Sequence, residues 1–410
     1  MSRRGSPVIL QKHMKTPSRN RSATKPISRL WSVQHILVPI DFSARSIRSI
    51  TTANQLAQRF GATVHLAHVH GYFYPAGFFA PGAPIPMSPV TYLEDAQKLA
   101  EQRLKDLAKK YRVTGTCHAR IGGPVFDEIC WVAREISADL IVTSTHGHTG
   151  LKRALLGSTA ERLIQHSPCP VFVARKRSTK HSQPGESKPG STGAIDTIVV
   201  PVDFSACSLA GLKYAVQFAE KFAAKILVFH VVDLGPLITA DGYAMYDLSA
   251  STERIVQEAE RRMREFVNAV KFGRVTHDTA VAAGGRVDGI CTVARLQKAD
   301  LIISATHGWT GFKHALIGST AEGVVRHAPC AVLVVPSHPE TRRDNLEQRL
   351  VAVRETRKRS QSNRSRKTLA DAAATPRSRR IAKHALSAPI LNRARNQLRS
   401  ASTKSTGSQR

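Results

Sequence analysis

A glycine-rich loop that leads into a helix occurs twice in this chain. It reads THGHTGLKRALLGST over 145–159 and THGWTGFKHALIGST over 306–320. Glycine lets the backbone turn tightly and approach a ligand, and the amino end of a helix offers free N–H groups and a positive dipole end. Phosphate is the ligand class that suits such a loop. Neither copy is GxxxxGK[ST] or GxGxxG, so the sequence does not predict a Walker-type or dinucleotide site.

A structural interpretation of the same loop stays open. Ser158-x-x-Glu161 and Ser319-x-x-Glu322 have the spacing of capping boxes. A capping box stabilises the start of a helix whether or not a ligand binds.

An aspartate follows an apolar run in each copy, within the motif P-[IV]-D-F-S-A. Asp41 and Asp203 can accept hydrogen bonds from a ribose or from the edge of a base. The alternative is that Asp, or the nearby Ser43 and Ser205, caps the following helix. The two roles are compatible, since a carboxylate can cap a helix and still face a cleft.

The sequence shows no catalytic constellation. His146 and His307 each precede a glycine at a turn, where we expect them to order the loop. There is no nucleophile–base pair and no cluster with metal-ligand spacing. We therefore predict no catalytic residue, no metal site and a binding protein rather than an enzyme, with slow ATP hydrolysis as a weaker option.

These motifs belong to a duplicated domain. HILVPIDFSARS at 35–46 returns as TIVVPVDFSACS at 197–208. The segment 139–174 returns at 300–335, with 21 of 36 positions identical. Such self-similarity at a fixed offset indicates that one unit occurs twice.

Each copy reads as alternating strands and helices. In the first copy we expect helices at 44–60, near 93–111, at 124–136 and from Ser158, between strands at 34–40, 62–69, 116–121, 138–144 and 170–174. Apolar strands separated by helices predict an α/β fold, with two doubly wound, five-stranded parallel-sheet (Rossmann-like) domains in tandem. Ligands of such sheets bind beyond the carboxyl ends of the strands. Asp41, Val69 and the first glycine loop should meet there, as should Asp203, Val231 and the second loop. The segment 71–92 would then be a lid or a partner surface, with an ordered cover as the equal alternative.

The net charge of +30 lies mostly outside these two copies. Residues 337–410 hold 19 Lys and Arg against 5 acids, and residues 1–34 hold 8 against none. The predicted organisation is a disordered basic tail (1–33), a first domain (34–175), a flexible linker (176–194), a second domain (195–336) and a disordered basic tail (337–410). The C-terminal tail should bind nucleic acid through phosphates without reading sequence; contact with acidic surfaces is the equal alternative.

Cysteine usage and hydropathy indicate a cytoplasmic location. The six cysteines form no CxxC pair, so we expect a reducing compartment. No apolar run reaches membrane-spanning length, and the N-terminus lacks the apolar core of a secretory signal. Met14 is a second candidate for the start of translation.

The quoted motifs resemble the universal stress protein family. The resemblance rests on V-P-[IV]-D-F-S, on H-V at the end of the second strand, and on T-H-G-x-T-G-[LF]-K-x-A-L-[LI]-G-S-T-A-E followed by P-C-x-V-x-V. It covers about 280 residues and implies a strand order of 3-2-1-4-5. It further implies pairing through the last strands, either between the two domains or in a homodimer.

The resemblance also implies a ligand, ATP with Mg, and roles for matched positions. Asp41 and Asp203 would contact adenosine, and the backbone at Val69 and Val231 would meet the base. The phosphates would be surrounded by Gly147, Gly157, Ser158 and Thr159 in the first domain and by Gly308, Gly318, Ser319 and Thr320 in the second.

Two departures from the family pattern lead to an alternative function. ATP-binding members have a glycine three residues before that of T-H-G, whereas this chain has Ser144 and Ala305. Gly285-Arg286 also replaces Pro124-Val125 in the second copy. An added Cβ crowding the ligand would make the chain a nucleotide-free tandem scaffold rather than a nucleotide-responsive module.

Overall fold

Strands and helices alternate along the chain in the predicted order. The computed structural model describes residues 9–10, 32–71, 89–145, 156–175, 195–233, 248–306 and 318–336. The first domain contains β2 (His35–Pro39), α1 (Ala44–Phe60), β3 (Thr63–Gly71), α2 (Pro89–Tyr111), β4 (Cys117–Gly122), α3 (Val125–Glu135), β5 (Leu140–Ser144), α4 (Ser158–His166) and β6 (Val171–Ala174). The second contains β7 (Thr197–Pro201), α5 (Ala206–Phe222), β8 (Lys225–Val232), α6 (Leu248–Asn268), β9 (His277–Ala283), α7 (Arg286–Leu296), β10 (Leu301–Ala305), α8 (Ser319–His327) and β11 (Ala331–Val335).

The strand order of each domain is the one that the resemblance implied. It is β4-β3-β2-β5-β6 in the first domain and β9-β8-β7-β10-β11 in the second, with parallel pairing throughout each. The order reverses between β2 and β5 and between β7 and β10. The predicted doubly wound α/β fold is therefore confirmed, and its ligand-binding position lies beside β2 and β7.

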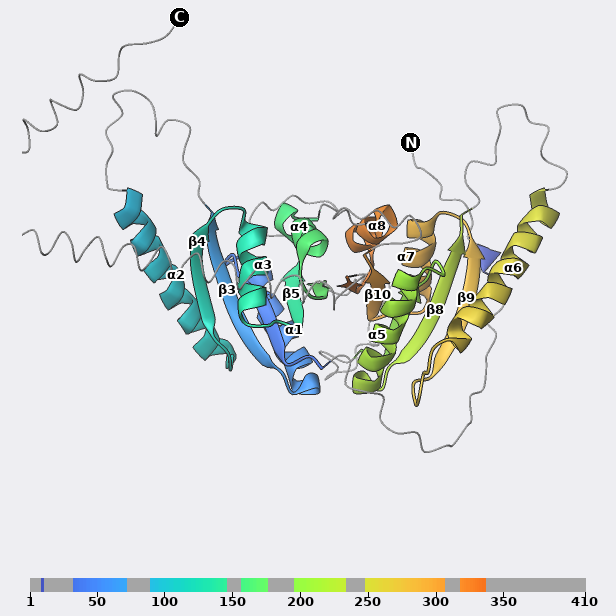
Figure 1. Cartoon of the computed structure of the whole chain (residues 1–410), viewed down its shortest axis with the longest axis horizontal. Helices are drawn as coiled ribbons and strands as arrows, with labels where there is room; N and C mark the ends of the chain where they lie inside the picture. The colour runs from blue at the N-terminus through green and yellow to red at the C-terminus, as the bar shows by residue number, and fades with distance from the viewer. Residues whose placement is uncertain are drawn as a thin grey trace, which may run out of the picture. The chain divides into compact units, whose positions relative to one another are not determined.

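Helices cover both faces of each sheet (Figure 1). In β2, Ile36 and Val38 pack in one hydrophobic cluster, with side chains of α1 and α2, whereas Leu37 packs in another with side chains of α3 and α4. This alternation follows from the two-residue side-chain period of a strand. Since both faces are covered, the buried positions of the central strands are mostly apolar; His65, Thr143 and Ser304 are polar exceptions.

The last strands join the two domains within the chain. β6 and β11 pair antiparallel, with Phe172 opposite Leu333, so the structure has one sheet of eleven strands. The ring of Phe60 at the end of α1 packs edge-on against Phe218 and Phe222 of α5. Of the two pairings that the resemblance implied, the structure contains the one between domains.

One short strand was not expected from the sequence. Ile9–Leu10 form β1, which pairs antiparallel with Ala282–Ala283 on the edge strand β9 of the second domain. The prediction of a wholly disordered segment 1–33 thus fails at these two residues, because an open sheet edge offers backbone partners even to a short apolar pair. The remaining tail, linker and lid predictions fall on residues outside the described ranges.

Candidate functional site

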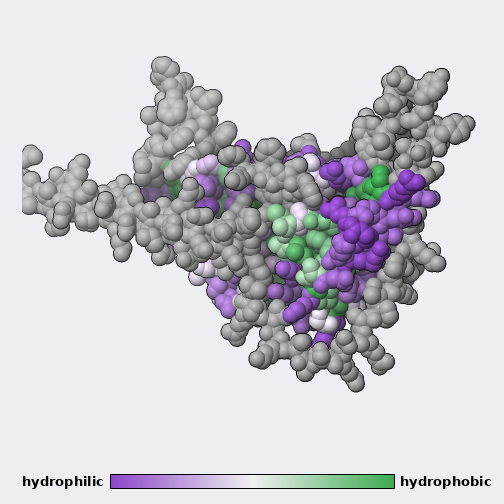
Figure 2. Space-filling view, turned by 45° about the vertical axis from the view of Figure 1, so that its right-hand side comes forward, coloured by the Kyte–Doolittle hydropathy of each residue, from purple (hydrophilic) through white to green (hydrophobic). Residues whose placement is uncertain are grey.

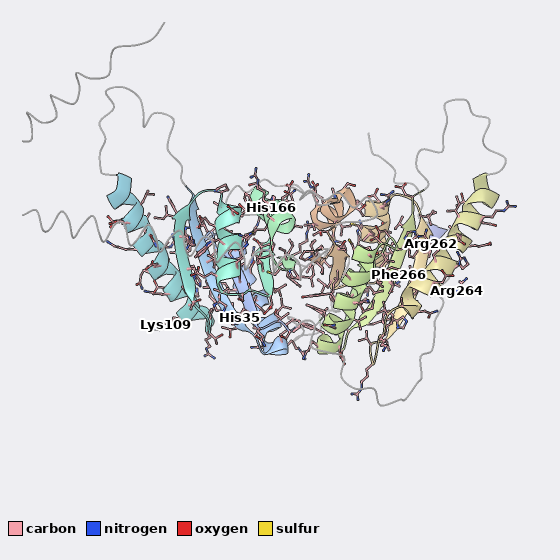
Figure 3. The ribbon with its side chains drawn as sticks, viewed as in Figure 1. His35, Lys109, His166, Arg262, Arg264 and Phe266 are labelled. Atoms are coloured by element: carbon pink, nitrogen blue, oxygen red, sulfur yellow. The ribbon has the colours of Figure 1, made fainter. Side chains whose placement is uncertain are left out.

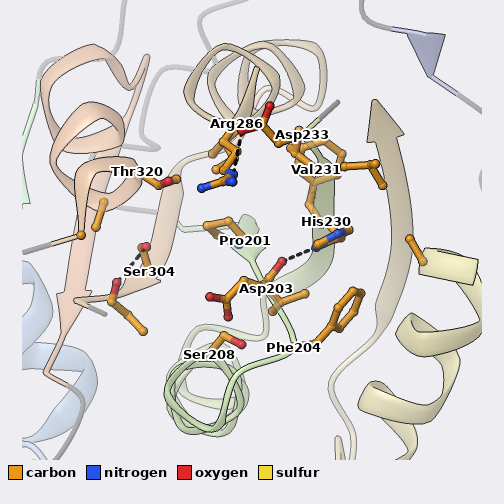
Figure 4. A pocket seen from close by; sticks show the side chains of 18 of the residues that line it. Pro201, Asp203, Phe204, Ser208, His230, Val231, Asp233, Arg286, Ser304 and Thr320 are labelled. Carbon is orange, nitrogen blue, oxygen red and sulfur yellow. Dashed lines mark hydrogen bonds and ion pairs between the residues drawn. The ribbon is translucent and has the colours of Figure 1, made fainter. Parts of the chain in front are cut away.

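A cavity of about 620 Å³ opens at the carboxyl ends of the second domain's strands. Among the predicted residues, Asp203, Val231, Gly318, Ser319 and Thr320 all line it. Figure 4 shows Asp203 and Thr320 on opposite sides of the cavity, with Val231 on a third. The fold thus brings together five of the six residues predicted for the second-domain site, while Gly308 lies outside the described part of the chain.

Asp203 is held by the turn between β7 and α5. Its Oδ1 accepts a hydrogen bond from the backbone N–H of Ser205 at 3.0 Å, and Ser205 is the N-cap residue of α5. Ser205 Oγ accepts from the N–H of Ser208 at 3.1 Å. Of the two capping candidates, Ser205 is the helix cap. Asp203 accepts a hydrogen bond from the backbone of Ser205 and also lines the cavity.

The residue between them has an unusual backbone conformation. Phe204 has a φ of 64°, in the left-handed region that a bulky residue rarely adopts. Its ring packs against that of His230 at 4.3 Å between centroids. Such strain costs on the order of 1–3 kcal/mol and is typical of functional sites. Phe42 repeats it in the first domain, with a φ of 62°.

His230 lines the cavity as a neutral imidazole. Its Nδ1 donates to the carbonyl oxygen of Val202 at 2.7 Å, and burial lowers the pKa of the ring below its usual value. The equivalent His68 donates to the carbonyl of Ile40 at 2.7 Å, and burial lowers its pKa as well. Both histidines therefore order the strand–helix turn and carry no charge toward a ligand at neutral pH.

The amino end of α8 differs from the predicted capping box. The N-cap residue is Gly318, which makes no side-chain capping bond, and Ser319 is the first residue of the helix. Gly157 and Ser158 repeat this arrangement at α4. The capping-box interpretation is wrong, because each serine lies one residue inside its helix. Without a capping side chain, the N–H groups of the first turn, which have no acceptor within the helix, are left for another acceptor.

The ends of the glycine loop are tied together by the backbone. The N–H of Gly318 donates to the carbonyl of Thr306 at 2.8 Å, and the N–H of Thr306 donates to Val335 at 3.0 Å. In the first domain, the N–H of Gly157 donates to Thr145 at 2.8 Å. The helix start is thereby fixed beside the end of the fourth strand.

Four charged lining residues were missed as site residues. Arg262 of α6 lies over the Phe204 ring at 4.8 Å, and Arg286 Nε lies 3.1 Å from an Asp233 carboxylate oxygen. Glu258 of α6 lines the same cavity. Figure 3 places Arg262 along α6, and Figure 4 shows Arg286 pointing into the cavity. The sequence analysis named Arg286 only as a departure from the family pattern, not as a site residue. Arg262 could have been found by aligning 98–108 with 257–267, which pairs it with Arg103.

Figure 2 brings the second-domain side of the molecule forward. Hydrophilic side chains follow the diagonal of α6, beside an apolar area. The lining of the cavity contains both apolar and charged side chains: Ile255 and Phe204 line it together with Arg262 and Glu258. An apolar wall with a few charged groups is the usual lining of a small-molecule site.

The first domain repeats part of this arrangement. Asp41 Oδ1 accepts from Ser43 N at 2.9 Å and from Ser46 Oγ at 2.5 Å, and Arg103 lies 3.9 Å above the Phe42 ring. Val69 is buried near the end of β3, and Ser158 and Thr159 begin α4. Gly147 lies outside the described residues. Asp41, Val69, Gly157, Ser158 and Thr159 thus occupy positions equivalent to those of the cavity residues.

In the second domain, the Cβ of Ala305, which stands where the family pattern has glycine, lies beside Gly211 of α5. Ala305 lines the cavity, but its Cβ lies 3.5 Å from where a Cβ on Gly211 of α5 would stand. The corresponding first-domain pair is Ser144 and the buried Ser49. At this 3.5 Å separation a Cβ on Gly211 would make only an ordinary van der Waals contact, so the Ala305 methyl group lies beside α5 as well as lining the cavity.

Neither a metal site nor a membrane span is found among the described residues. No three His, Cys, Asp or Glu side chains converge as metal ligands in these ranges. None of the helices described has the length and apolar character needed to cross a bilayer.

Comparison with known proteins places the chain in a family. The sequence profile of the universal stress protein family matches residues 32–175 and 194–336. The chain therefore belongs to the universal stress protein family and carries two such domains in tandem.

Individual relatives match one domain at a time. Universal stress protein MJ0531 of Methanocaldococcus jannaschii is 33% identical over 138 residues, which are 34% of this chain and 80% of the relative. Universal stress protein A homolog 1 of Coxiella burnetii is 32% identical over 142 residues, 34% of this chain and 94% of the relative.

Solved structures of universal stress proteins also match the chain. A universal stress protein from Archaeoglobus fulgidus covers 74% of this chain and 97% of its own, with a TM-score of 0.48 and 19% identity. A universal stress protein solved in complex with cAMP covers 35% of this chain and 97% of its own, with a TM-score of 0.25 and 24% identity.

Proposed function

We propose that this chain is a nucleotide-responsive stress protein whose second domain binds an adenine nucleotide and whose occupancy changes contacts with partners. The observation that carries the proposal is the second-domain cavity, where Asp203, the free amino end of α8 and two arginines face one volume. None of the six cysteines, all of which lie within the described residues, forms a disulfide bond, which supports action in the reducing cytoplasm.

The residues present fit a nucleoside triphosphate. First-turn N–H groups of α8, with the hydroxyls of Ser319 and Thr320, would receive phosphate oxygens, since a helix start favours anions. Arg262 and Arg286 would supply positive charge, and Asp203 would accept from ribose hydroxyls. Because no three-ligand cluster occurs among the described residues, Mg would arrive on the phosphates and keep most of its waters.

Titration of Mg·ATP into the full-length chain, followed by calorimetry, tests this function. We expect saturable binding that Asp203→Ala weakens strongly. Since the basic tails attract polyanions, the same titration with inorganic triphosphate measures the contribution of charge alone. Equal heats for ATP and triphosphate, unaffected by Asp203→Ala, would refute the site.

The competing function is a nucleotide-free scaffold. It is favoured by the continuous sheet through β6 and β11, which pairs the two domains within one chain. In that case the wild-type chain does not bind Mg·ATP, and its function would depend on protein contacts.

The basic tails carry a separate proposal. With 19 Lys and Arg in residues 337–410, the C-terminal segment would bind nucleic acid through phosphates. Binding to duplexes of unrelated sequence should be equal and should weaken steeply with salt. Binding that survives deletion of 337–410, or that does not respond to salt, would exclude this role.

A further inference from the structure

The carboxyl end of α8 is held by a residue of the first domain. Arg175, directly after β6, donates from its guanidinium to the carbonyl oxygens of Val325 at 2.6 Å, Arg326 at 2.7 Å and Ala328 at 2.9 Å. These carbonyls end α8, where a helix has unsatisfied acceptors and a negative dipole end. The guanidinium is partly buried, and this burial lowers its pKa, so the contact is largely shielded from solvent.

A second link from the first domain reaches the first turn of the same helix. Arg326 contacts Glu322 at 2.6 Å, four residues earlier on α8, and lies 3.8 Å from Glu161 on α4. Glu322 and Glu161 are each in the first turn of their helix. The guanidinium of Arg326 therefore connects the two helix starts that are predicted to face phosphate.

These links are one-sided. The residue equivalent to Arg175 in the second domain is Pro336, and the residue equivalent to Arg326 in the first is Gln165. Proline has no N–H and glutamine carries no charge. The first domain thus contacts the second domain's helix α8 through Arg175, and the second domain has no equivalent arginine to contact α4 of the first.

The helix that is held is short and lacks a capping side chain at its start. α8 has nine residues, so its two ends are about 13 Å apart. Isolated helices of fewer than about 12 residues are marginal in water. Its position therefore depends on contacts with neighbouring elements. One of these contacts is made at Gly323 of α8, where a Cβ would lie 2.6 Å from Val287 Cγ2 of α7. The amino end, where Ser319 and Thr320 line the cavity, moves with the whole helix.

We propose that Arg175 of the first domain is a positioning residue for the anion-binding end of α8, so that ligand binding by the second domain depends on the first. Arg326 reinforces it by tying α4 to the first turn of α8. The proposal rests on the proposed nucleotide site, which it extends by assigning part of that site's support to the other domain.

Hydrogen–deuterium exchange of the full-length chain tests the proposal, with and without Mg·ATP. The peptides to follow span α8 (319–327) and α4 (158–166). In Arg175→Gln without ligand, we expect exchange of the α8 amides that are hydrogen-bonded within the helix (322–327) to quicken about tenfold, since three hydrogen bonds from a charged group are lost. The ATP concentration that half-protects the first turn of α8 should rise by a similar factor, and both values for α4 should stay unchanged.

Three further variants separate positioning from a general loss of stability. Arg175→Lys keeps the charge but not the planar fork, and should recover part of the effect. Arg326→Gln, which copies the first domain, should produce a smaller effect in the same direction. Lys225→Gln is the matched control, because it removes the 2.6 Å ion pair with Asp278 at the amino ends of the same domain's strands; it should leave α8 unchanged.

Two results would overturn the proposal. One is unchanged exchange of the hydrogen-bonded amides of α8 (322–327) in Arg175→Gln; the other is an equal loss of protection in α4, which would make Arg175 a general support of the fold. If Mg·ATP protects neither helix in the wild-type chain, the nucleotide function fails. The exchange rates without ligand then still decide whether Arg175 positions α8.

Discussion

The two domains share a fold and a strand–turn–helix motif but differ in the charge around the ligand-binding position. Asp203, His230 and Arg262 of the second domain have the counterparts Asp41, His68 and Arg103 in the first. Three charged cavity residues do not: Asp233, Glu258 and Arg286 correspond to Gly71, Leu99 and Val125. The two domains thus share the residues that shape the turn and differ in the charged residues that would meet a ligand.

The first domain has its own charged cluster near the corresponding strand end. Arg120 pairs with Glu128 at 2.6 Å and stacks 3.9 Å above the Trp131 ring. The second domain has Ala282 and Gly289 at the first two of these positions. Each domain thus pairs an arginine with a carboxylate near this strand end, Arg120 with Glu128 and Arg286 with Asp233, but from different positions of the fold.

The largest expected effect comes from the shared aspartate. Asp203→Ala removes a ligand acceptor and the brace on Ser205, and should weaken Mg·ATP binding about 30-fold, equivalent to about 2 kcal/mol. Calorimetry on the full-length chain measures it. Asp41→Ala is the matched change in the first domain. If it causes the larger loss, the functional site lies in the first domain and the comparison is reversed.

The divergent arginine should have the next largest effect. Arg286→Val gives the second domain the residue of the first, and should weaken Mg·ATP binding about tenfold, because a charge-assisted contact is lost. The salt dependence of binding should fall in parallel. Arg120→Gln, which changes an arginine already paired with Glu128, serves as control. Unchanged affinity in Arg286→Val would show that this charge has no part in binding.

A smaller difference concerns acid stability, and it lies at the amino ends of the first domain's strands. His65 Nε2 lies 3.1 Å from His35 Nδ1, and its Nδ1 lies 2.8 Å from Thr116 Oγ1. Burial, with the nearby His35 and His118 adding to it, lowers the pKa of His65 from 6.5 to about 4. The folded chain therefore binds fewer protons than the unfolded chain between these values, so stability is full above pH 6.5 and is lost as pH falls toward 4.

The second domain has Leu227 in place of His65, which supplies the test. In His65→Leu, the loss of stability between pH 6.5 and 4.5 should shrink by about 1 kcal/mol, after allowance for solvent screening. Urea unfolding at several pH values measures this change. His327→Gln, at an exposed position of the second domain, should leave the pH dependence as it is. An unaltered dependence in His65→Leu would mean that other groups govern acid unfolding.

The smallest effect is expected where the family pattern predicts a large one. Ala305→Gly should change the affinity for Mg·ATP less than about threefold, because the methyl group is small and lies beside Gly211 of α5 at the edge of the cavity. An increase of about tenfold or more would show that the Cβ does crowd the ligand. The nucleotide-free interpretation would then describe the wild-type chain.

The sequence predicted the fold well because its signals are local and occur twice. Apolar strand runs, the serines that cap α1 and α5 and the repeated motif define the elements, and the helix at 44–60 was predicted with the bounds that the structure has. The alternation of strands with helices then leaves few topologies for a parallel sheet. The pairing of Ile9–Leu10 with β9 could not be foreseen, since two apolar residues in a basic segment carry no periodicity.

The candidate site was predicted less completely. Residues within the repeated motifs, such as Asp203 and Thr320, line the cavity as expected. Arg262 comes from the middle of a long helix, where an arginine looks like any other surface charge until packing turns it toward Phe204. The capping box failed for a similar reason, since Ser158-x-x-Glu161 has the right spacing but starts one residue too late. Contacts between distant elements decide both cases.

The central claim is that the second-domain cavity, built around Asp203 and the start of α8, binds an adenine nucleotide. Hydrogen–deuterium exchange of the full-length chain with increasing Mg·ATP tests it most directly, because it reports on 319–323 and 158–162 separately. The account predicts saturable protection of 319–323 that Asp203→Ala removes. No protection of 319–323 at millimolar Mg·ATP, or protection that persists in Asp203→Ala, would contradict it.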